Sequence, residues 1–145
     1  MPRMIRDGAI VEDSRDQDDI LSLDQWQQLE NRAGTAVQLQ PDQPPAPLLE
    51  HLAEIELVVV NFTAFMDGRG FSYGRELRER GFTGELRASG AIIRDQLHYL
   101  LRCGFNAFEF DGDIDLEEAC ASLRDFSEHY QAAIDEPLPL FRRRA

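Results

Sequence analysis

A continuous apolar run, Leu57-Val58-Val59-Val60-Asn61-Phe62, constrains the fold more than any other segment of the chain. A strand that is apolar on both faces is typical of a parallel sheet, which is covered on both sides. Strands are predicted at 36–40, 57–62, 85–89 and 105–110, and a helical pattern follows each of them. Four consecutive β-α units predict an α/β fold with a small parallel sheet, either a half-barrel or an open sheet.

Local signals set the ends of the other predicted elements. Asp7-Gly8 indicates the turn of an N-terminal hairpin, and Ser22 begins a helix that Gly34 ends. Further helices are predicted at about 48–52, at 71–80, at 91–102 and from Asp115 onward. We therefore expect three regions: 1–34 with the hairpin, an acidic stretch and a helix, a β-α core domain at 35–131, and a proline-containing extended arm at 132–145.

Composition narrows the class of protein. The 145 residues fit one domain, and a net charge of −12 argues against binding to nucleic acid or to an anionic membrane. No apolar run is long enough to cross a bilayer, and the N-terminus lacks the apolar stretch of a signal peptide, so we expect a cytoplasmic protein. Cys103 and Cys120 form no CxxC pair and no zinc pattern, and we expect two buried thiols. We find no metal site and no evident cofactor cradle.

The segment from Asp67 to Arg102 is cationic within this acidic chain. It holds seven of the fifteen arginines and five acids, and the chain contains no lysine. We call these seven arginines the cationic island. Such an island suggests an anion site or a partner surface.

Parallel α/β folds bind ligands at the carboxyl ends of their strands. Glycines at the start of a helix let backbone N–H groups converge on an anion, and an adjacent arginine holds it in a bidentate manner. The predicted ligand-binding residues, which follow the second and third strands, are Gly68, Arg69, Gly70, Ser72, Arg87, Ser89, Gly90 and Arg94. Asp67 and Asp95 are the candidate catalytic bases.

The same residues could instead have a purely structural role, which is the alternative to an anion site. Asp67 would then cap a tight turn, and Arg87 would form a buried ion pair with Asp95. After the fourth strand come Glu109, Asp111 and Asp113. The acids from Asp111 to Asp115 do not match a calcium loop and favour the N-terminus of a helix, or they face the arginines of the neighbouring strand ends.

The stretch from Phe65 to Phe108 resembles a bacterial family, domain of unknown function family 934. The similar motifs are Phe65-Met66-Asp67-Gly68-Arg69-Gly70-Phe71-Ser72, Gly84-Glu85-Leu86-Arg87-Ala88-Ser89-Gly90, Arg94-Asp95-Gln96-Leu97 and Arg102-Cys103-Gly104-Phe105-Asn106-Ala107-Phe108. The resemblance extends from about Val37 to Arg144. Two positions depart from it: Phe71 replaces a tyrosine, and Gly90-Ala91 replaces glycine-aspartate. The resemblance implies an oxidoreductase-type protein of sulfite reduction and, as its partner, the sulfite reductase haemoprotein.

Three functions follow as hypotheses. The first is an accessory protein of assimilatory sulfite reduction that binds a sulfur oxyanion, or the haemoprotein, through the arginine-rich strand ends. The second is a small enzyme on a half-barrel that acts on an anionic small molecule with a carboxylate as general base. The third is a non-catalytic structural subunit. Its N-terminal helix and C-terminal arm would then pack against a second copy of the chain and form a homodimer.

Overall fold

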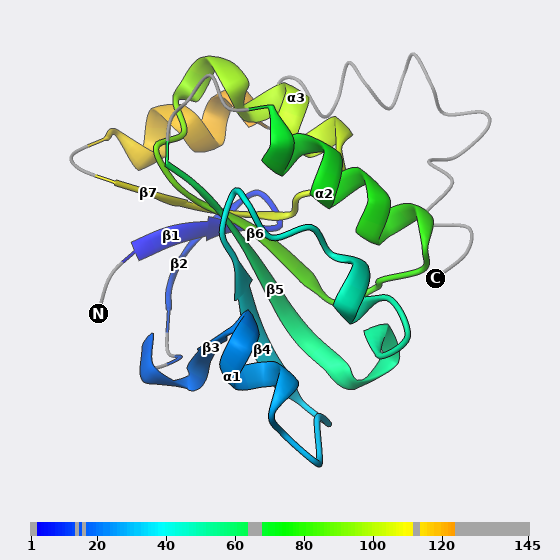
Figure 1. Cartoon of the computed structure of the whole chain (residues 1–145). Helices are drawn as coiled ribbons and strands as arrows, with labels where there is room; N and C mark the ends of the chain where they lie inside the picture. Colours follow the sequence, from blue (N-terminus) through cyan, green and yellow to red (C-terminus); the bar gives the residue numbers. More distant parts are fainter. Residues whose placement is uncertain (1–2, 14, 16, 64–67, 112–113, 124–145) are drawn as a thin grey trace.

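The chain forms a mixed α/β fold around one seven-stranded sheet (Figure 1). The computed structural model describes residues 3–13, 15, 17–63, 68–111 and 114–123. The order of the strands across the sheet is β2-β1-β7-β6-β5-β4-β3. Their bounds are β1 (Arg3–Arg6), β2 (Ala9–Glu12), β3 (Ile20–Ser22), β4 (Thr35–Leu39), β5 (Ile55–Phe62), β6 (Glu85–Gly90) and β7 (Ala107–Phe110). Strands β3 to β7 are parallel neighbours in chain order, and the antiparallel hairpin β1-β2 extends the sheet beyond β7.

The helices pack on one face of this sheet. They are α1 (Leu23–Gln27), α2 (Arg69–Glu79), α3 (Leu97–Arg102) and a helix over 116–123. Their apolar side chains join those of alternate strand positions in one large core, which contains Trp26, Leu77, Leu100, Val58 and Val60. Figure 1 shows α2 and α3 lying along the same side of the sheet. Among the described residues, no helix is long and apolar enough to cross a membrane.

The opposite face, which we call the concave face, is covered by no α-helix among the described residues. The connection from Glu12 to Ile20, which we call the strap, joins the two edge strands β2 and β3. It reaches at most about 23 Å, because three of its residues form a 3₁₀ turn. The edges of a flat seven-stranded sheet lie about 29 Å apart. The sheet must therefore curl around this face, which explains why Leu57 and Val59 are buried there although no described helix covers them.

The predicted strands are found, and the sheet is larger than predicted. The α/β class is confirmed, and β4, β5, β6 and β7 lie at the four predicted places. The hairpin is also confirmed, with Asp7 and Gly8 in the left-handed region at φ 52° and 81°. The prediction of a small parallel sheet missed that this hairpin and the short strand β3 join the same sheet. The predicted arm at 132–145 lies outside the described residues.

The helix predicted at 71–80 is confirmed as α2, whereas three other predicted helices were too long, for local reasons. The first ends at Gln27 instead of continuing to Gly34, because the Arg32 guanidinium donates to the carbonyl oxygens of Trp26 and Gln27. Helical structure after β6 begins at Arg94, not at Ala91, since the Ala91 N–H donates to the Phe62 carbonyl. The helix predicted at 48–52 is two 3₁₀ turns, Ala46–Leu48 and Leu52–Glu54. Cys103 and Cys120 are buried and free, as predicted.

Close packing of α2 on the sheet allows a test of this fold. A Cβ atom added to Gly74 would lie 2.4 Å from the Phe105 ring, which is fully buried and cannot move aside. We expect Gly74→Ala to lower the free energy of unfolding by roughly 1–2 kcal/mol, because overpacking outweighs the better helix propensity of alanine. Urea denaturation, followed by the fluorescence of Trp26, measures the change.

Gly68→Ala is the matched control, because nothing lies within 4 Å of its added Cβ. It should shift the midpoint little. Equal effects of the two substitutions would contradict the packing of α2 against Phe105.

Candidate functional site

The cationic island separates in space into two groups. Arg78 and Arg87 are buried. The other five side chains are exposed: Arg69, Arg75, Arg80, Arg94 and Arg102. The island is therefore not one cluster of arginines around one anion.

Arg78 has a structural role that its sequence position did not reveal. Its guanidinium donates to the carbonyl oxygens of Gly104 (2.8 Å), Phe82 (2.8 Å) and Gly84 (3.0 Å). Burial lowers its pKa to about 10, with the charge of Asp7 acting in the opposite direction. Arg78 thus remains charged at neutral pH and joins the end of α2 to the loops that precede β6 and β7.

Arg87 occupies the centre of the concave face. Its side chain is 1% exposed, and it lies 2.8 Å from Glu85, 3.0 Å from Asp13 of the strap and 3.4 Å from Glu109 of β7. Burial lowers the pKa of Arg87, but attraction by Glu85, Asp13 and Glu109 outweighs it, so the pKa is raised. Arg6 lies 2.7 Å from Glu85, in a direction that makes an ion pair but no hydrogen bond.

Above Arg87, a pocket of about 180 Å³ opens at the carboxyl ends of the parallel strands. We call it the strand-end pocket. Asn61, Ser89 and Glu109 form a row across it, since they are register partners on β5, β6 and β7. The whole lining is Ile20, Gln38, Val59, Asn61, Ser89, Gly90, Glu109 and Asp111.

Most polar side chains that line the strand-end pocket form few or no hydrogen bonds with other described residues. The Asn61 side chain donates to Gln40 at 2.8 Å. Glu109 accepts, among the described residues, from Arg87 alone. Within the same part of the chain, the side chains of Gln38, Ser89 and Asp111 have no hydrogen-bond partner. Gln38 and Ser89 are half-buried and Asp111 is exposed, so their polar atoms remain open to water or to a polar ligand.

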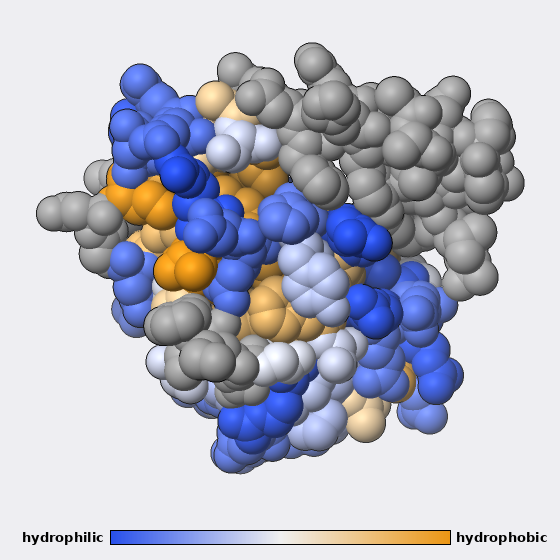
Figure 2. All heavy atoms as spheres, turned by 90° about the horizontal axis from the view of Figure 1, so that it is seen from above, coloured by the Kyte–Doolittle hydropathy of each residue, from blue (hydrophilic) through white to orange (hydrophobic). Residues whose placement is uncertain are grey.

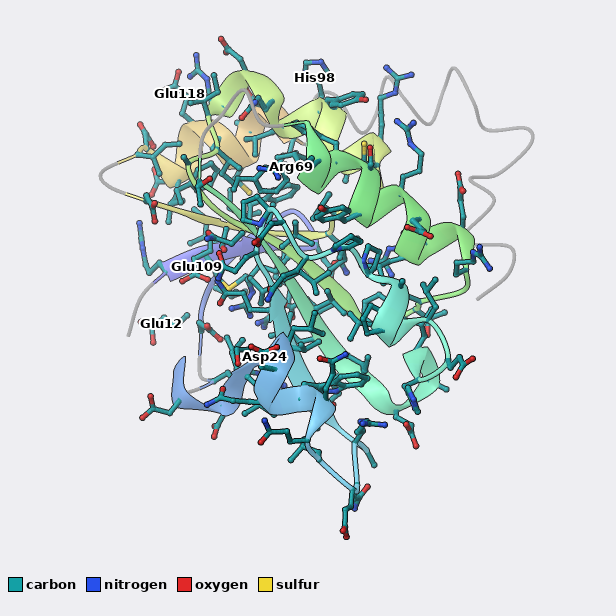
Figure 3. The ribbon with its side chains drawn as sticks, viewed as in Figure 1. Glu12, Asp24, Arg69, His98, Glu109 and Glu118 are labelled. Atoms are coloured by element: carbon teal, nitrogen blue, oxygen red, sulfur yellow. The ribbon has the colours of Figure 1, made fainter. Side chains whose placement is uncertain are left out.

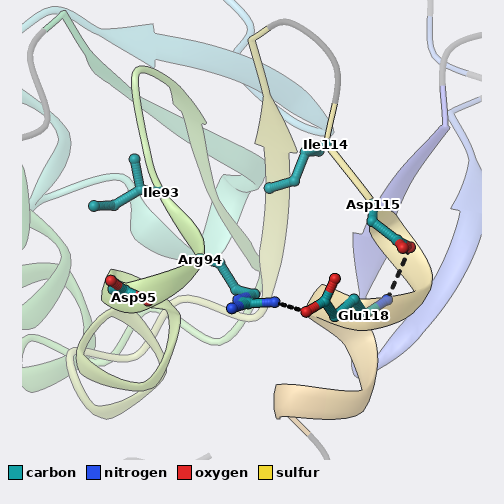
Figure 4. Close-up of a pocket in the computed structure, with 6 residues that line it drawn as sticks. All are labelled: Ile93, Arg94, Asp95, Ile114, Asp115 and Glu118. Atoms are coloured by element: carbon teal, nitrogen blue, oxygen red, sulfur yellow. Dashed lines mark hydrogen bonds and ion pairs between the residues drawn. The ribbon is translucent and has the colours of Figure 1, made fainter.

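A second hollow, of about 330 Å³, lies between the loop after β6 and the helix over 116–123 (Figure 4). Ile93, Arg94 and Asp95 line one side of it, and Ile114, Asp115 and Glu118 line the other. Three of its polar side chains are engaged, and Asp95 has no partner among the described residues. Arg94 forms an ion pair with Glu118, and the Glu118 N–H donates to the Asp115 carboxylate at 3.0 Å, which is the predicted helix cap.

The structure places the predicted site residues in four different settings. Asp67 lies outside the described residues. Gly68, Arg69, Gly70 and Ser72 form the start of α2, where Gly70 packs against the Phe62 ring and Arg69 and Ser72 are exposed. Figure 3 shows Arg69 at this helix start and Glu109 on the sheet.

Of the remaining predicted residues, Ser89 and Gly90 line the strand-end pocket, whereas Arg94 and Asp95 line the second hollow. Arg87 is buried beneath the pocket. The alternative of a buried Arg87–Asp95 pair is wrong, because Asp95 is exposed and Arg87 binds Asp13, Glu85 and Glu109.

Three residues of the concave face were not predicted as site residues: Glu85, Gln38 and Asp13. The sequence pattern indicated the face of the first two. Glu85, Arg87 and Ser89 alternate with Leu86 and Ala88, and this period of two places all three polar side chains on one face of β6. The same rule places Gln38 on the concave face of β4 beside Val37 and Leu39 on the core face. Asp13 had no such signal, because it lies in an acidic stretch without periodicity.

The buried ion pairs predict a large effect at Arg87. Arg87→Leu leaves Asp13 and Glu85 with only the more exposed Arg6 as a counter-charge, so we expect a loss of about 3 kcal/mol or more in the free energy of unfolding. Arg94→Leu is the control, because its pair with Glu118 is exposed and contributes about 1 kcal/mol or less. Chemical denaturation of both variants measures the difference. A wild-type midpoint for Arg87→Leu would contradict the central role of this network.

Comparison with known proteins assigns a family. Neither a curated protein nor a solved structure matches the chain significantly. A family model described as "Bacterial protein of unknown function (DUF934)" matches residues 36–141, which include every parallel strand from β4 to β7. The chain therefore belongs to this bacterial family, DUF934.

Proposed function

We propose that this protein is a small cytoplasmic half-barrel that binds a small polar molecule in the strand-end pocket. One observation carries the proposal: Gln38, Ser89 and Asp111 point unpaired, among the described residues, into a cavity at the carboxyl ends of parallel strands. This is the position at which α/β barrels and open sheets bind their ligands.

The half-barrel form of this proposal has three supports. Strands β3 to β7 are parallel neighbours in chain order, as in a barrel. Among the described residues, the α-helices cover only the outer face, while on the concave face Asp13 of the strap contacts Arg87 and Arg15 pairs with Glu56 at the start of β5 at 3.2 Å. Access to the concave face is therefore from the carboxyl ends of the strands.

The chemistry of the pocket favours Glu109 as the carboxylate that accepts a hydrogen bond or a proton from a bound molecule. Glu109 is 27% exposed, lines the cavity and is held from behind by the buried Arg87. A carboxylate in this position accepts a hydrogen bond, or a proton, from a bound molecule. In this proposal it replaces Asp95, which lies in the second hollow. A volume of about 180 Å³ restricts the ligand to a molecule smaller than a drug-sized compound.

A pocket-filling variant tests the proposal. Ser89→Val places a branched apolar side chain in the cavity on a strand that tolerates it, so we expect small polar fragments to stop binding while the fold persists. The measurement is a fragment screen by ¹H–¹⁵N NMR, with amide shifts of residues 38, 61, 89 and 109 as the readout.

Ser72→Val, on the exposed side of α2, is the matched control and should keep the binding. If no fragment shifts these four amides in the wild type, or if Ser89→Val binds equally well, the proposed function is wrong.

A second candidate concerns the outer surface. Arg69, Arg75, Arg80, Arg94 and Arg102 are exposed on elements of the helix side, in a chain of net charge −12. Figure 2 shows that the surface over these elements is mainly hydrophilic, with small separate apolar patches. This local excess of arginine favours an acidic partner surface. The family resemblance suggests the sulfite reductase haemoprotein as the partner, and an oxyanion role would fall to Arg69 at the start of α2.

Light scattering after size exclusion tests the partner. We expect the haemoprotein and this protein to elute together at low salt, and we expect Arg94→Glu with Arg102→Glu to weaken the complex about tenfold or more through lost charge complementarity. Arg3→Glu, at an exposed position on β1 away from the helices, makes the same charge change per residue and is the control; it should leave the complex intact. Separate elution of the wild-type proteins would reject this candidate, and the same profile reports whether the chain is a homodimer.

A further inference from the structure

We infer that the ligand of the strand-end pocket carries a positively charged nitrogen, in a small aliphatic amine or guanidine. The inference rests on the proposed function, because it names the class of molecule that the same pocket selects. It follows from the charges around the cavity, from the geometry of Glu109 and from the donors and acceptors that remain unused.

Acids outnumber bases around the concave face. The ion-pair network around the buried Arg87 and Asp13 contains Arg6 and Arg87 against Asp13, Glu85 and Glu109, and Asp111 adds a further carboxylate at the rim of the pocket. The described part of this site therefore has two more carboxylates than guanidinium groups. A bound cation would reduce this imbalance, whereas a bound anion would increase it.

The Arg87 charge is not available to a ligand. Its Nε and Nη2 atoms both donate to Glu85, and Nη1 is shared between Asp13 and Glu109. The side chain is 1% exposed, so Glu109 stands between the guanidinium and the cavity. An anion in the pocket would meet the Glu109 carboxylate before it met Arg87.

Among the three carboxylates around Arg87, Glu109 has the most unused hydrogen-bonding capacity. Its contact with Arg87 is 3.4 Å, the longest of the three, and one of its oxygens accepts no hydrogen bond from the described residues. Asp111 lies two residues further along the chain and lines the same cavity. An ammonium group has three donors and no acceptor, so two carboxylates and the amide oxygen of Gln38 or Asn61 match it.

Three probes of equal chain length separate charge from size. The probes are 1,4-diaminobutane, 1,4-butanediol and succinate, titrated by NMR and calorimetry at about 0.15 M salt to suppress attraction to the acidic surface. We expect the diamine to bind with one-site saturation and to shift the amides of residues 38, 61, 89 and 109. Succinate should leave these amides unchanged, and the diol should bind at least about tenfold more weakly than the diamine.

Two variants localise the effect. Asp111→Asn alters an exposed group and should preserve the fold, and Glu109→Gln alters the carboxylate beneath it. Each should weaken diamine binding about tenfold or more. Glu117→Gln, which removes the same charge from an exposed position on the helix over 116–123, should bind like the wild type.

The outcomes distinguish this inference from the proposed function. Binding of the diol or of succinate in the pocket, without the diamine, would overturn the inference and leave the proposed function intact. Diamine binding that Glu109→Gln, Asp111→Asn and Glu117→Gln weaken equally would show adsorption to an acidic surface and would also overturn it. If no probe and no fragment shifts the pocket amides, both proposals fail.

Discussion

The buried guanidinium of Arg87 is the constraint on which the concave face depends. A charge that is 1% exposed must be compensated, since an unpaired buried ion costs several kcal/mol. Its three carboxylate partners come from its own strand, from β7 and from the strap. Asp13 directly follows the edge strand β2, so its ion pair ties the start of the strap to β6 across the sheet. This ion pair and the limited reach of the strap both favour a curled sheet.

The same arrangement divides the concave face along the strands. Near the strand starts, the strap and the ion pairs of Arg87 and Arg15 fill the space. Towards the carboxyl ends, the register partners Asn61, Ser89 and Glu109 line the cavity, and Ile20 at the end of the strap borders it. Glu109 belongs to both parts, because one oxygen contacts Arg87 and the carboxylate also lines the pocket. The network that stabilises the fold therefore also orients the acid that the site offers.

Sequence patterns predicted the parts of this structure that depend on local physics. The apolar run at 57–62 located the buried strand β5, and Asp7-Gly8 located the hairpin, because each signal acts within a few residues. The helix ends were less predictable, since Arg32 caps α1 by folding back from a loop. The partner of Arg87 was beyond prediction in principle, because Asp13 lies 74 residues away in the chain. The alternation of polar and apolar residues in β6 did indicate that Glu85, Arg87 and Ser89 share one face of the sheet.

A local excess of arginine in the sequence does not measure charge on the surface. Arg78 is bound to buried carbonyl oxygens and Arg87 to carboxylates, so neither charge is exposed. The other five arginines of the cationic island are exposed, and they lie on elements of the helix side. The strand-end pocket, by contrast, is acid-rich. The two faces therefore have opposite electrostatic preferences. A macromolecular partner at the helices and a small molecule at the strand ends would not compete for the same charges, so both proposals are physically compatible in one chain.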